Sequence, residues 1–200
     1  MIPNGYTDLA PGKIASVVTY LEMLEKPAAE RPTAAANESR VWLKPVKDPA
    51  LDWYRSLFRR AGAQWLWFSR LEMSDEELKA VLDRPTTELF LAVGEAGEIG
   101  MAELDRCTPQ EVEIASFALF GEAIGRGLGR PFMSALLEKA WSGATKRVWL
   151  HTCTLDGPTA LAFYQRCGFR PYKRAIEVAD DPRLRGVLPE DAAPQVPIIR

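Results

Sequence analysis

Residues 111–130, EVEIASFALFGEAIGRGLGR, constrain the fold of this chain more than any other segment. They read as an apolar strand, a short turn and then glycines that open a helix. The first N–H groups of a helix have no partner inside it, and the helix dipole favours negative charge there. A strand that delivers closely spaced glycines to such a helix start is typical of a phosphate-binding loop.

The glycine spacing narrows the kind of phosphate ligand. Gly125, Gly127 and Gly129 alternate with other residues. A dinucleotide fingerprint needs G-x-G-x-x-G, and here the third glycine comes one residue too early. A P-loop needs a Lys after its last glycine, and none follows.

The segment resembles motif A of the GNAT superfamily, the acetyl-CoA-dependent N-acetyltransferases, whose pattern is Gln/Arg-x-x-Gly-x-Gly/Ala. Gly127 and Gly129 fit the two small positions. Ile124 stands where the family usually has Gln or Arg, so one pyrophosphate contact is missing, and Arg126 or Arg130 could supply the charge instead.

Residues 155–169, LDGPTALAFYQRCGF, resemble motif B of the same family, commonly Asn-x-x-Ala-x-x-x-Tyr-x-x-x-Gly-Phe. Gly157 replaces the usual Asn and removes its pantetheine contact, for which Asp156 could compensate. Both motifs occur in the family's order and are separated by one strand, which together indicate acyl-CoA binding. The matching positions of motif B are Ala160, Tyr164, Gly168 and Phe169.

The length and amino-acid composition of the chain are typical of one globular domain. With 200 residues, 47% hydrophobic and 26% charged, the chain can bury a core. A net charge of −2 gives no indication of nucleic-acid binding, and no apolar run reaches the roughly 18 residues of a membrane span. The N-terminus lacks a signal-peptide pattern, so we expect a cytoplasmic protein.

Cysteine and histidine usage argues against a metal site. Cys107, Cys153 and Cys167 are widely spaced, form no C-x-x-C pair, and accompany a single histidine, His151. Reduced thiols and no metal are therefore expected.

Hydrophobic periodicity and turn residues predict most elements along the chain. Ser74 and Glu77 form a capping box at the start of one helix. Residues 14–24 combine helical spacing with β-branched residues, so helix and strand both remain open. The expected strands are 40–46, 87–93, 97–105, 111–120, 147–153 and 169–177, an extended segment is expected at 65–71, and helices are expected at about 48–60, 75–83, 131–141 and 156–168.

This order matches the α/β (α+β) GNAT fold, a mixed and mostly antiparallel central sheet with helices on both faces and splayed central strands. The resemblance covers about residues 40–178. It leaves an N-terminal extension, 1–39, and a C-terminal tail, 179–200, in which 196–199 could add an edge strand.

The resemblance implies transfer of an acetyl group from acetyl-CoA to a primary amine by direct attack in a ternary complex. In the family the pantetheine pairs with the strand edge that the neighbouring strand, here 147–153, leaves open, and a backbone N–H near Leu119 would stabilise the oxyanion. The implied coenzyme-binding residues are Phe117, Ala118, Leu119, Ile124, Gly125, Arg126, Gly127, Leu128, Gly129, Arg130, Ala160 and Tyr164.

Glu113 is the candidate general base. Strand alternation places Glu113, Ala115, Phe117 and Leu119 on one face, and a carboxylate on an apolar face gains proton affinity. Histone-type members of the family carry a glutamate base at this position. The alternative is a solvated residue near the strand start, and Glu103 is the next choice of base.

Tyr164 is the candidate general acid, because a phenol with an ordinary pKa near 10 stays protonated at neutral pH. The alternative is an aromatic core residue beside Phe163. His151 could be a pocket or core residue or a proton relay. A Cys153–His151 dyad is also conceivable, but two residues apart on a strand is too local a spacing to specify one.

The acceptor is a small-molecule or protein amine, and the region that would cover it, 48–86, is rich in aromatic residues. These could form a wall for an amine or belong to the core: Trp53, Tyr54, Trp65, Trp67 and Phe68. A homodimer is compatible with the sequence, which does not decide the oligomeric state. Two rival functions remain, a catalytically inactive acyl-CoA sensor and a nucleotide-dependent enzyme of another α/β fold.

Overall fold

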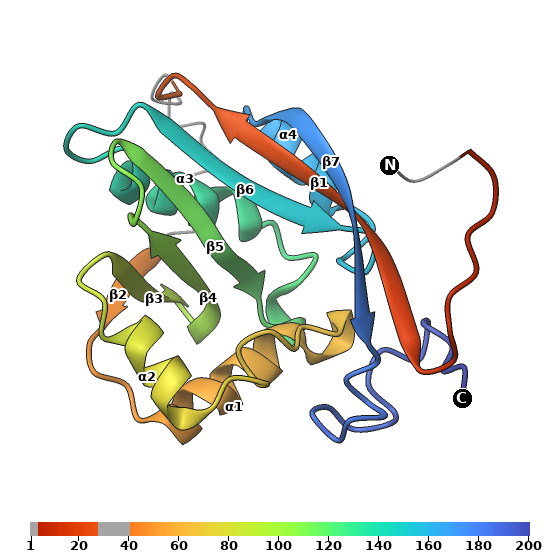
Figure 1. Ribbon diagram of the computed structural model, residues 1–200. Helices are drawn as coiled ribbons and strands as arrows, with labels where there is room; N and C mark the ends of the chain where they lie inside the picture. The colour runs from red at the N-terminus through yellow and green to blue at the C-terminus, as the bar shows by residue number, and fades with distance from the viewer. Residues whose placement is uncertain (1–3, 28–40) are drawn as a thin grey trace.

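The computed structural model describes residues 4–27 and 41–200 (Figure 1). The elements in chain order are β1 (Lys13–Met23), β2 (Trp42–Val46), α1 (Leu51–Gly62), the 3-10 turn η2 (Ala63–Trp65), α2 (Asp75–Leu82), β3 (Thr87–Gly94), β4 (Gly97–Asp105), β5 (Glu111–Leu119), the 3-10 turn η3 (Gly121–Ala123), α3 (Gly129–Ala140), β6 (Arg147–Cys153), α4 (Ala160–Arg166) and β7 (Arg170–Asp180).

The strands of the described residues form one sheet in the order β2-β3-β4-β5-β6-β1-β7. Every neighbouring pair is antiparallel except β5 and β6, which are parallel. α1 and α2 pack on one face, and α3 and α4 lie on the other (Figure 1). The predicted mixed, mostly antiparallel sheet with helices on both faces is confirmed.

Residues 14–24, which the sequence left open between helix and strand, supply β1. This strand lies between β6 and β7 and is antiparallel to both, so that Val18 is the partner of Cys153 on one side and of Ala175 on the other. Its β-branched residues suit a strand that is paired along both edges. The N-terminal segment is therefore an interior strand of the sheet and connects β6 to the outer strand β7.

β5 and β6 pair only over Glu111–Glu113 and Arg147–Trp149, after which the ladder ends. Beyond this point β6 continues in register with β1. The splayed central strands expected from the sequence are thus present, and the edge of β5 that follows Glu113 is open.

A β-bulge in β5 reverses which face each side chain takes. Glu103 is opposite Ser116, whereas the next residue, Leu104, is opposite Ile114, so Ala115 is the extra residue. The expectation that Glu113 and Phe117 share one face is wrong for this reason. After the bulge Phe117 and Leu119 pack with the α3 cluster, and Ala118 packs with the α1 cluster.

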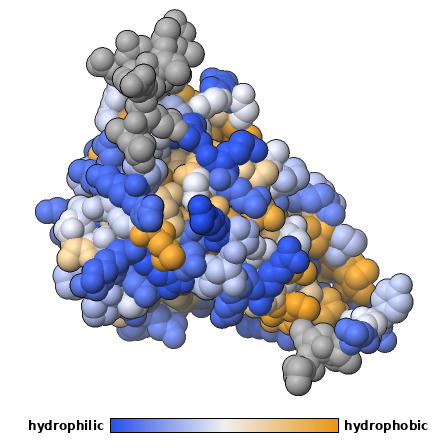
Figure 2. Space-filling model, turned by 90° about the horizontal axis from the view of Figure 1, so that it is seen from above, coloured by the Kyte–Doolittle hydropathy of each residue, from blue (hydrophilic) through white to orange (hydrophobic). Residues whose placement is uncertain are grey.

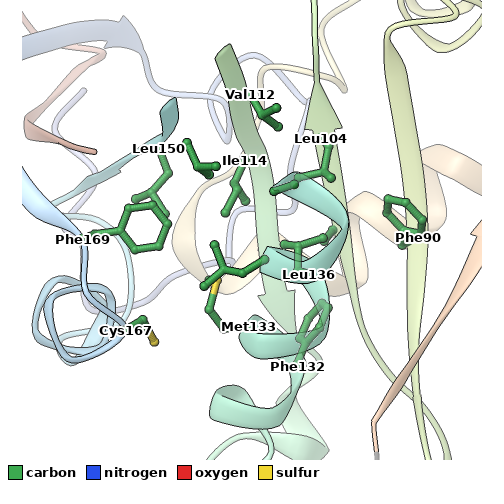
Figure 3. Close-up of a cluster of buried hydrophobic side chains, with 14 of the residues drawn as sticks. Phe90, Leu104, Val112, Ile114, Phe132, Met133, Leu136, Leu150, Cys167 and Phe169 are labelled. Carbon is green, nitrogen blue, oxygen red and sulfur yellow. The ribbon is translucent and has the colours of Figure 1, made fainter. Parts of the chain in front are cut away.

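The main core lies between α3 and the sheet. Met133 and Leu136 on one face of α3 point toward Ile114 of β5, and Phe132 belongs to the same buried cluster (Figure 3). These side chains are at most 4% exposed, and burial of each contributes about 1.5–3 kcal/mol. Packing of these apolar side chains against the sheet therefore holds the start of α3 close to the end of β5.

Two expectations about irregular segments are wrong. Residues 65–71 are not extended: the chain turns back after α1, with the Trp67 N–H donating to Gly62 O at 3.0 Å and Leu66 at φ +55°. Leu66 is buried against Leu188 of the C-terminal tail, a tertiary contact that the local sequence does not encode. Residues 196–199 form no strand.

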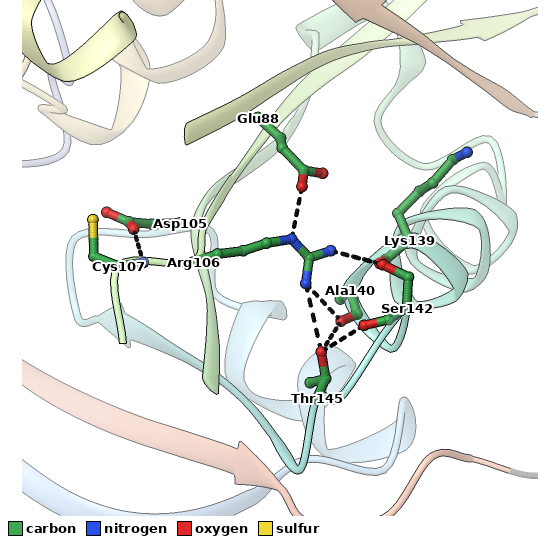
Figure 4. A network of polar contacts seen from close by, with 8 residues as sticks. All are labelled: Glu88, Asp105, Arg106, Cys107, Lys139, Ala140, Ser142 and Thr145. Carbon is green, nitrogen blue, oxygen red and sulfur yellow. Dashed lines mark hydrogen bonds and ion pairs between the residues drawn. The ribbon is translucent and has the colours of Figure 1, made fainter. Parts of the chain in front are cut away.

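Arg106, just after β4, fixes the C-terminal end of α3 (Figure 4). Its guanidinium donates to Lys139 O at 2.7 Å, to Ala140 O at 3.3 Å and to the Glu88 carboxylate at 2.6 Å. The last carbonyls of a helix lack partners within it, so this arginine satisfies them from the sheet.

Arg106→Ala is expected to lower the free energy of unfolding by about 1–3 kcal/mol, because the Glu88 carboxylate and the Lys139 carbonyl lose this donor and the Ala140 carbonyl keeps only the hydroxyl of Thr145. Chemical denaturation measures the change. Arg185→Ala, which removes an exposed ion pair with Asp180, is the control and should cost less than about 1 kcal/mol. Equal effects of the two substitutions would contradict the role given to Arg106.

Hydrophobic residues gather toward one end of the surface seen from above, whereas hydrophilic residues predominate elsewhere (Figure 2). Among the exposed apolar residues are Val17 on β1 and Ile176 and Val178 on β7. Within residues 4–27 and 41–200, no helix has the length and apolar character needed to cross a membrane.

Candidate functional site

The glycines between β5 and α3 form an open main-chain cradle. Gly125 and Gly127 have φ of +79° and +75°, and nothing lies within 4 Å of a Cβ built on either residue. Gly129 begins α3, whose start has no side-chain cap. The N–H groups of this first turn are therefore placed to bind an anion.

This cradle lines one side of a cleft of about 670 Å³, and residues of α4 and the segment before it line the other. Arg130 and Arg166 are the cations of the cleft, and the Arg130 guanidinium donates to Arg166 O at 2.6 Å. The sequence-predicted residues that line the cleft are Phe117, Ala118, Leu119, Ile124, Gly125, Gly127, Gly129, Arg130, Ala160 and Tyr164.

Two of the predicted coenzyme residues lie elsewhere. Arg126 and Leu128 line a neighbouring pocket together with Arg60 and Glu122. Of the two arginines that could compensate for Ile124, the structure therefore places Arg130 in the cleft, while Arg126 lies beside the pocket of Arg60.

The open edge of β5, which pairs with no further strand of the described residues after Glu113, faces this cleft. The Phe120 N–H donates to Ile99 O of β4 at 2.8 Å. Because successive N–H groups of a strand point to opposite neighbours, the Leu119 N–H points away from β4, toward the gap left by β6. An extended amide-bearing chain could add to this edge as a further strand.

A second cavity, of about 470 Å³, lies on the other side of the gap. It is bounded by the sheet face of β4, β5 and β6 and by the turns after α1. We call it the acceptor cavity. The cleft and the acceptor cavity meet at a junction formed by the five residues that line both spaces. These residues are Trp65, Trp67, Phe117, Asp156 and Tyr164.

Tyr164 lies at this junction on α4. Its ring makes edge-to-face contacts with Phe117, Phe163 and Phe169, and its hydroxyl makes no hydrogen bond with the described residues. Burial raises the pKa of Tyr164 well above its ordinary value, and the charge of Asp156 adds to this. The phenol is thus protonated at neutral pH and available as a donor.

Glu113 lines the acceptor cavity on the face of β5 that looks toward α1, directly opposite Asp105 of β4. Its side chain is 25% exposed. Burial, with a further contribution from the charge of Asp105, raises the pKa of Glu113 to about 7, against the opposing effect of Arg70. A carboxylate with this pKa exchanges a proton readily at neutral pH.

Glu103, the second choice of base, is held in a buried network. The Tyr54 hydroxyl donates to its Oε1 at 2.5 Å, and Arg70 Nη2 donates to its Oε2 at 3.3 Å. Glu103 is 1% exposed. Both oxygens have donors, so its evident role is to tie α1 and the turn carrying Arg70 to the sheet.

His151 lines the acceptor cavity from β6, 47% exposed, with its Nδ1 3.8 Å from Glu113 Oε1. Its ring lies 5.6 Å from that of Tyr20. Burial raises the pKa of Cys153, which keeps this thiol protonated and weakly nucleophilic. The geometry therefore favours His151 as a neighbour of Glu113 over a Cys–His dyad.

Asp156 connects the motif B turn to the aromatic segment after α1. Its Oδ1 accepts from Trp67 Nε1 at 2.9 Å, and its Oδ2 accepts from Thr152 Oγ1 at 2.7 Å and from the Cys153 N–H at 2.9 Å. Both oxygens have donors within the protein. Asp156 thus holds Trp67 at the junction, where it lines the cleft as well as the acceptor cavity.

Of the aromatic residues in 48–86, the structure brings Trp65, Trp67 and Phe68 to the acceptor cavity. Trp53 is 40% exposed on α1, and Tyr54 is buried beneath Glu103.

The sequence reasoning missed Arg166, Thr159 and Ser116 as lining residues. The positions of Thr159 and Arg166, both within motif B, were the available signal for two of them. Among the residues described, no group of three or more His, Cys, Asp and Glu side chains is arranged to hold a metal ion.

The model of the acetyltransferase (GNAT) family matches residues 36–169 of this chain. No curated protein matches the sequence. Solved structures share the fold. A spermidine N-acetyltransferase from Vibrio cholerae, in complex with CoA and spermine, has 17% identity and a TM-score of 0.53 over 71% of this chain and 97% of its own.

Two further structures are similar at low identity. An acetyltransferase from Thermus thermophilus has 19% identity and a TM-score of 0.50, covering 70% of this chain and 96% of its own. A functionally unknown conserved protein from Staphylococcus epidermidis has 16% identity and a TM-score of 0.54 over 85% of this chain. The chain spans only 64% of the length of that protein.

Proposed function

The chain belongs to the acetyltransferase (GNAT) family, and from this we propose that it is an N-acetyltransferase that transfers the acetyl group of acetyl-CoA to a primary amine in a ternary complex. The observation that carries the proposal is the junction at Phe117 and Tyr164. There a cleft with a glycine cradle meets a cavity that contains a carboxylate of raised pKa.

Acetyl-CoA is the co-substrate that fits the cleft. The open space at Gly125 and Gly127 suits a pyrophosphate, for which Arg130 and Arg166 supply positive charge. The pantetheine amides would pair with the open edge of β5 near Leu119. This arrangement would place the thioester at the junction, with the amine in the acceptor cavity.

Each candidate residue then has one task. Glu113 accepts the proton that the amine loses as its nitrogen bonds to the thioester carbonyl carbon. The Leu119 N–H is placed to stabilise the negative charge that develops on the carbonyl oxygen. When the carbon–sulfur bond breaks, the Tyr164 hydroxyl gives its proton to the departing thiolate. Alignment in the two spaces supplies the largest share of the rate, about 7–11 kcal/mol.

A turnover assay that measures free CoA over a panel of amines tests the proposal. Release of CoA that depends on the amine supports it. Binding of acetyl-CoA without turnover of any amine would instead favour the inactive sensor, the rival that the departures at Ile124 and Gly157 suggest.

Tyr164→Phe is expected to lower kcat by about 100-fold, because the thiolate must then leave without a proton donor. The Kd for acetyl-CoA should stay within roughly threefold, since the variant keeps the ring and removes a hydroxyl that makes no hydrogen bond within the described part of the chain. Steady-state kinetics and calorimetry measure the two quantities.

Tyr172→Phe on β7, an exposed tyrosine outside both spaces, is the matched control and should leave kcat unchanged. If Tyr164→Phe has the kcat of the parent protein with a good amine, Tyr164 is not the general acid.

A further inference from the structure

We propose, on the basis of the function proposed above, that the amine acceptor carries a second positive charge, as in a short diamine. Its second ammonium would bind at Asp105 and Ser116 beside the base Glu113.

Acidic side chains outnumber basic ones around the acceptor cavity. Its carboxylates come from β4, β5, β7 and the turn before α4, whereas its guanidinium comes from Arg70 and its imidazole from His151. The carboxylates are those of Glu103, Asp105, Glu113, Asp156 and Glu177. A neutral or anionic acceptor would leave this charge uncompensated in a partly enclosed space.

The partners of these charged groups show which carboxylate lacks a cation among the described residues. Arg70 is already paired with Glu103, and Asp156 has donors on both oxygens. Asp105 accepts one main-chain hydrogen bond, from the Cys107 N–H at 2.7 Å, and pairs with no cation in the described part of the chain. It lies directly opposite Glu113, and two carboxylates in this position repel each other.

Ser116 is the independent indication of a ligand. This residue is 6% exposed and lines the acceptor cavity, yet its Oγ has no hydrogen-bond partner among the described residues. It is the cross-strand partner of Glu103, so it lies on the same sheet face as Glu103 and Asp105. A buried hydroxyl normally has a partner, and a substrate ammonium can donate to it.

The aromatic wall fits the same ligand. Trp67 and Phe68 line the acceptor cavity opposite the sheet. Aromatic faces attract ammonium groups, and the methylene chain of a diamine can pack on them. The carboxylates, the free hydroxyl and the aromatic rings therefore match one chemical class of acceptor.

The test compares a four-carbon diamine, butylamine and 4-aminobutanoate as acceptors at pH ~8.5, where Glu113 is ionised. We expect kcat/KM for the diamine to exceed that for butylamine by roughly tenfold or more, with 4-aminobutanoate the poorest acceptor. Asp105→Asn should reduce the preference for the diamine over butylamine to about threefold or less.

Ser116→Ala removes a hydroxyl that has no partner in residues 4–27 and 41–200, so the variant should fold normally and should raise the KM for the diamine several-fold. Glu95→Gln makes the same charge change as Asp105→Asn on an exposed turn outside the acceptor cavity and should keep the parent preference.

Two outcomes would overturn the inference in distinguishable ways. Equal kcat/KM for butylamine and the diamine in the parent protein would reject the second ammonium and leave the acetyltransferase proposal standing. Absence of CoA release with every amine, despite binding of acetyl-CoA, would reject both proposals.

Discussion

Glu113→Gln is expected to lower kcat/KM by a factor of about 10²–10⁴, the usual contribution of a general base. The amide keeps the size of the side chain and cannot accept the proton that the amine loses. Steady-state kinetics with a saturating concentration of acetyl-CoA measure the effect.

The pH dependence identifies the base independently. The pKa of Glu113 is raised to about 7, so the reactive carboxylate forms as pH rises through about 7. kcat/KM for a weakly basic amine, which is already neutral in this range, should therefore rise with pH, with a midpoint near 7, and level off roughly one pH unit higher. Glu113→Gln should remove this step, and Asp105→Asn should move its midpoint lower, because the charge of Asp105 helps to raise the pKa.

Glu111→Gln is the matched control. This residue lies two positions earlier on β5, is paired with Arg147 at 2.9 Å and lines neither the cleft nor the acceptor cavity. Its kcat/KM should stay within about twofold of the parent value. A pH step that persists in Glu113→Gln would assign the base to another group.

Gly127→Glu is expected to raise the Kd for acetyl-CoA by about 100-fold, or about 2.7 kcal/mol. Gly127 has φ +75° and faces the open space of the cradle, so the change adds backbone strain and a negative charge beside the phosphates. Calorimetric titration with acetyl-CoA measures the affinity directly.

The control variant Gly143→Glu separates the effect of backbone strain from the effect of a negative charge beside the phosphates. Gly143 has φ +69° and open space around its Cβ position, like Gly127, but it lies after α3, outside the cleft. The control should share the loss of stability, of order 1–2 kcal/mol, and bind acetyl-CoA with the parent affinity. An unchanged Kd for Gly127→Glu would contradict the proposal that this loop binds the phosphates of acetyl-CoA.

Local signals were strong enough to predict most elements. The capping box at Ser74 and Glu77 is present at the start of α2, with both hydrogen bonds formed. The hairpin of β3 and β4 and the helix that follows the glycines also appear where residue patterns indicated. These elements are encoded by contacts between residues a few positions apart, which a sequence displays directly.

The two motifs predicted the family and most of the cleft, since a glycine cradle is made by main-chain atoms and depends on spacing alone. The acceptor side could not be predicted as well. The alternation of β5 indicated one face for Glu113 and Phe117, but the bulge at Ala115 separates them, and both faces of this strand are partly or fully buried. A regular alternation of residue types along the strand therefore does not indicate that the side chains change faces at the bulge.

By itself, the sequence predicted the cradle at Gly125–Gly129, most of the elements, and the phenol and carboxylate that we propose for proton transfer. Only the tertiary structure decided that residues 13–23 enter the sheet between β6 and β7, that Asp156 holds Trp67 at the junction, and that Ser116 lines the acceptor cavity without a hydrogen-bond partner among the residues described. These features depend on pairing between segments far apart in the chain, and such pairing is selected by packing of the whole domain rather than by local preference.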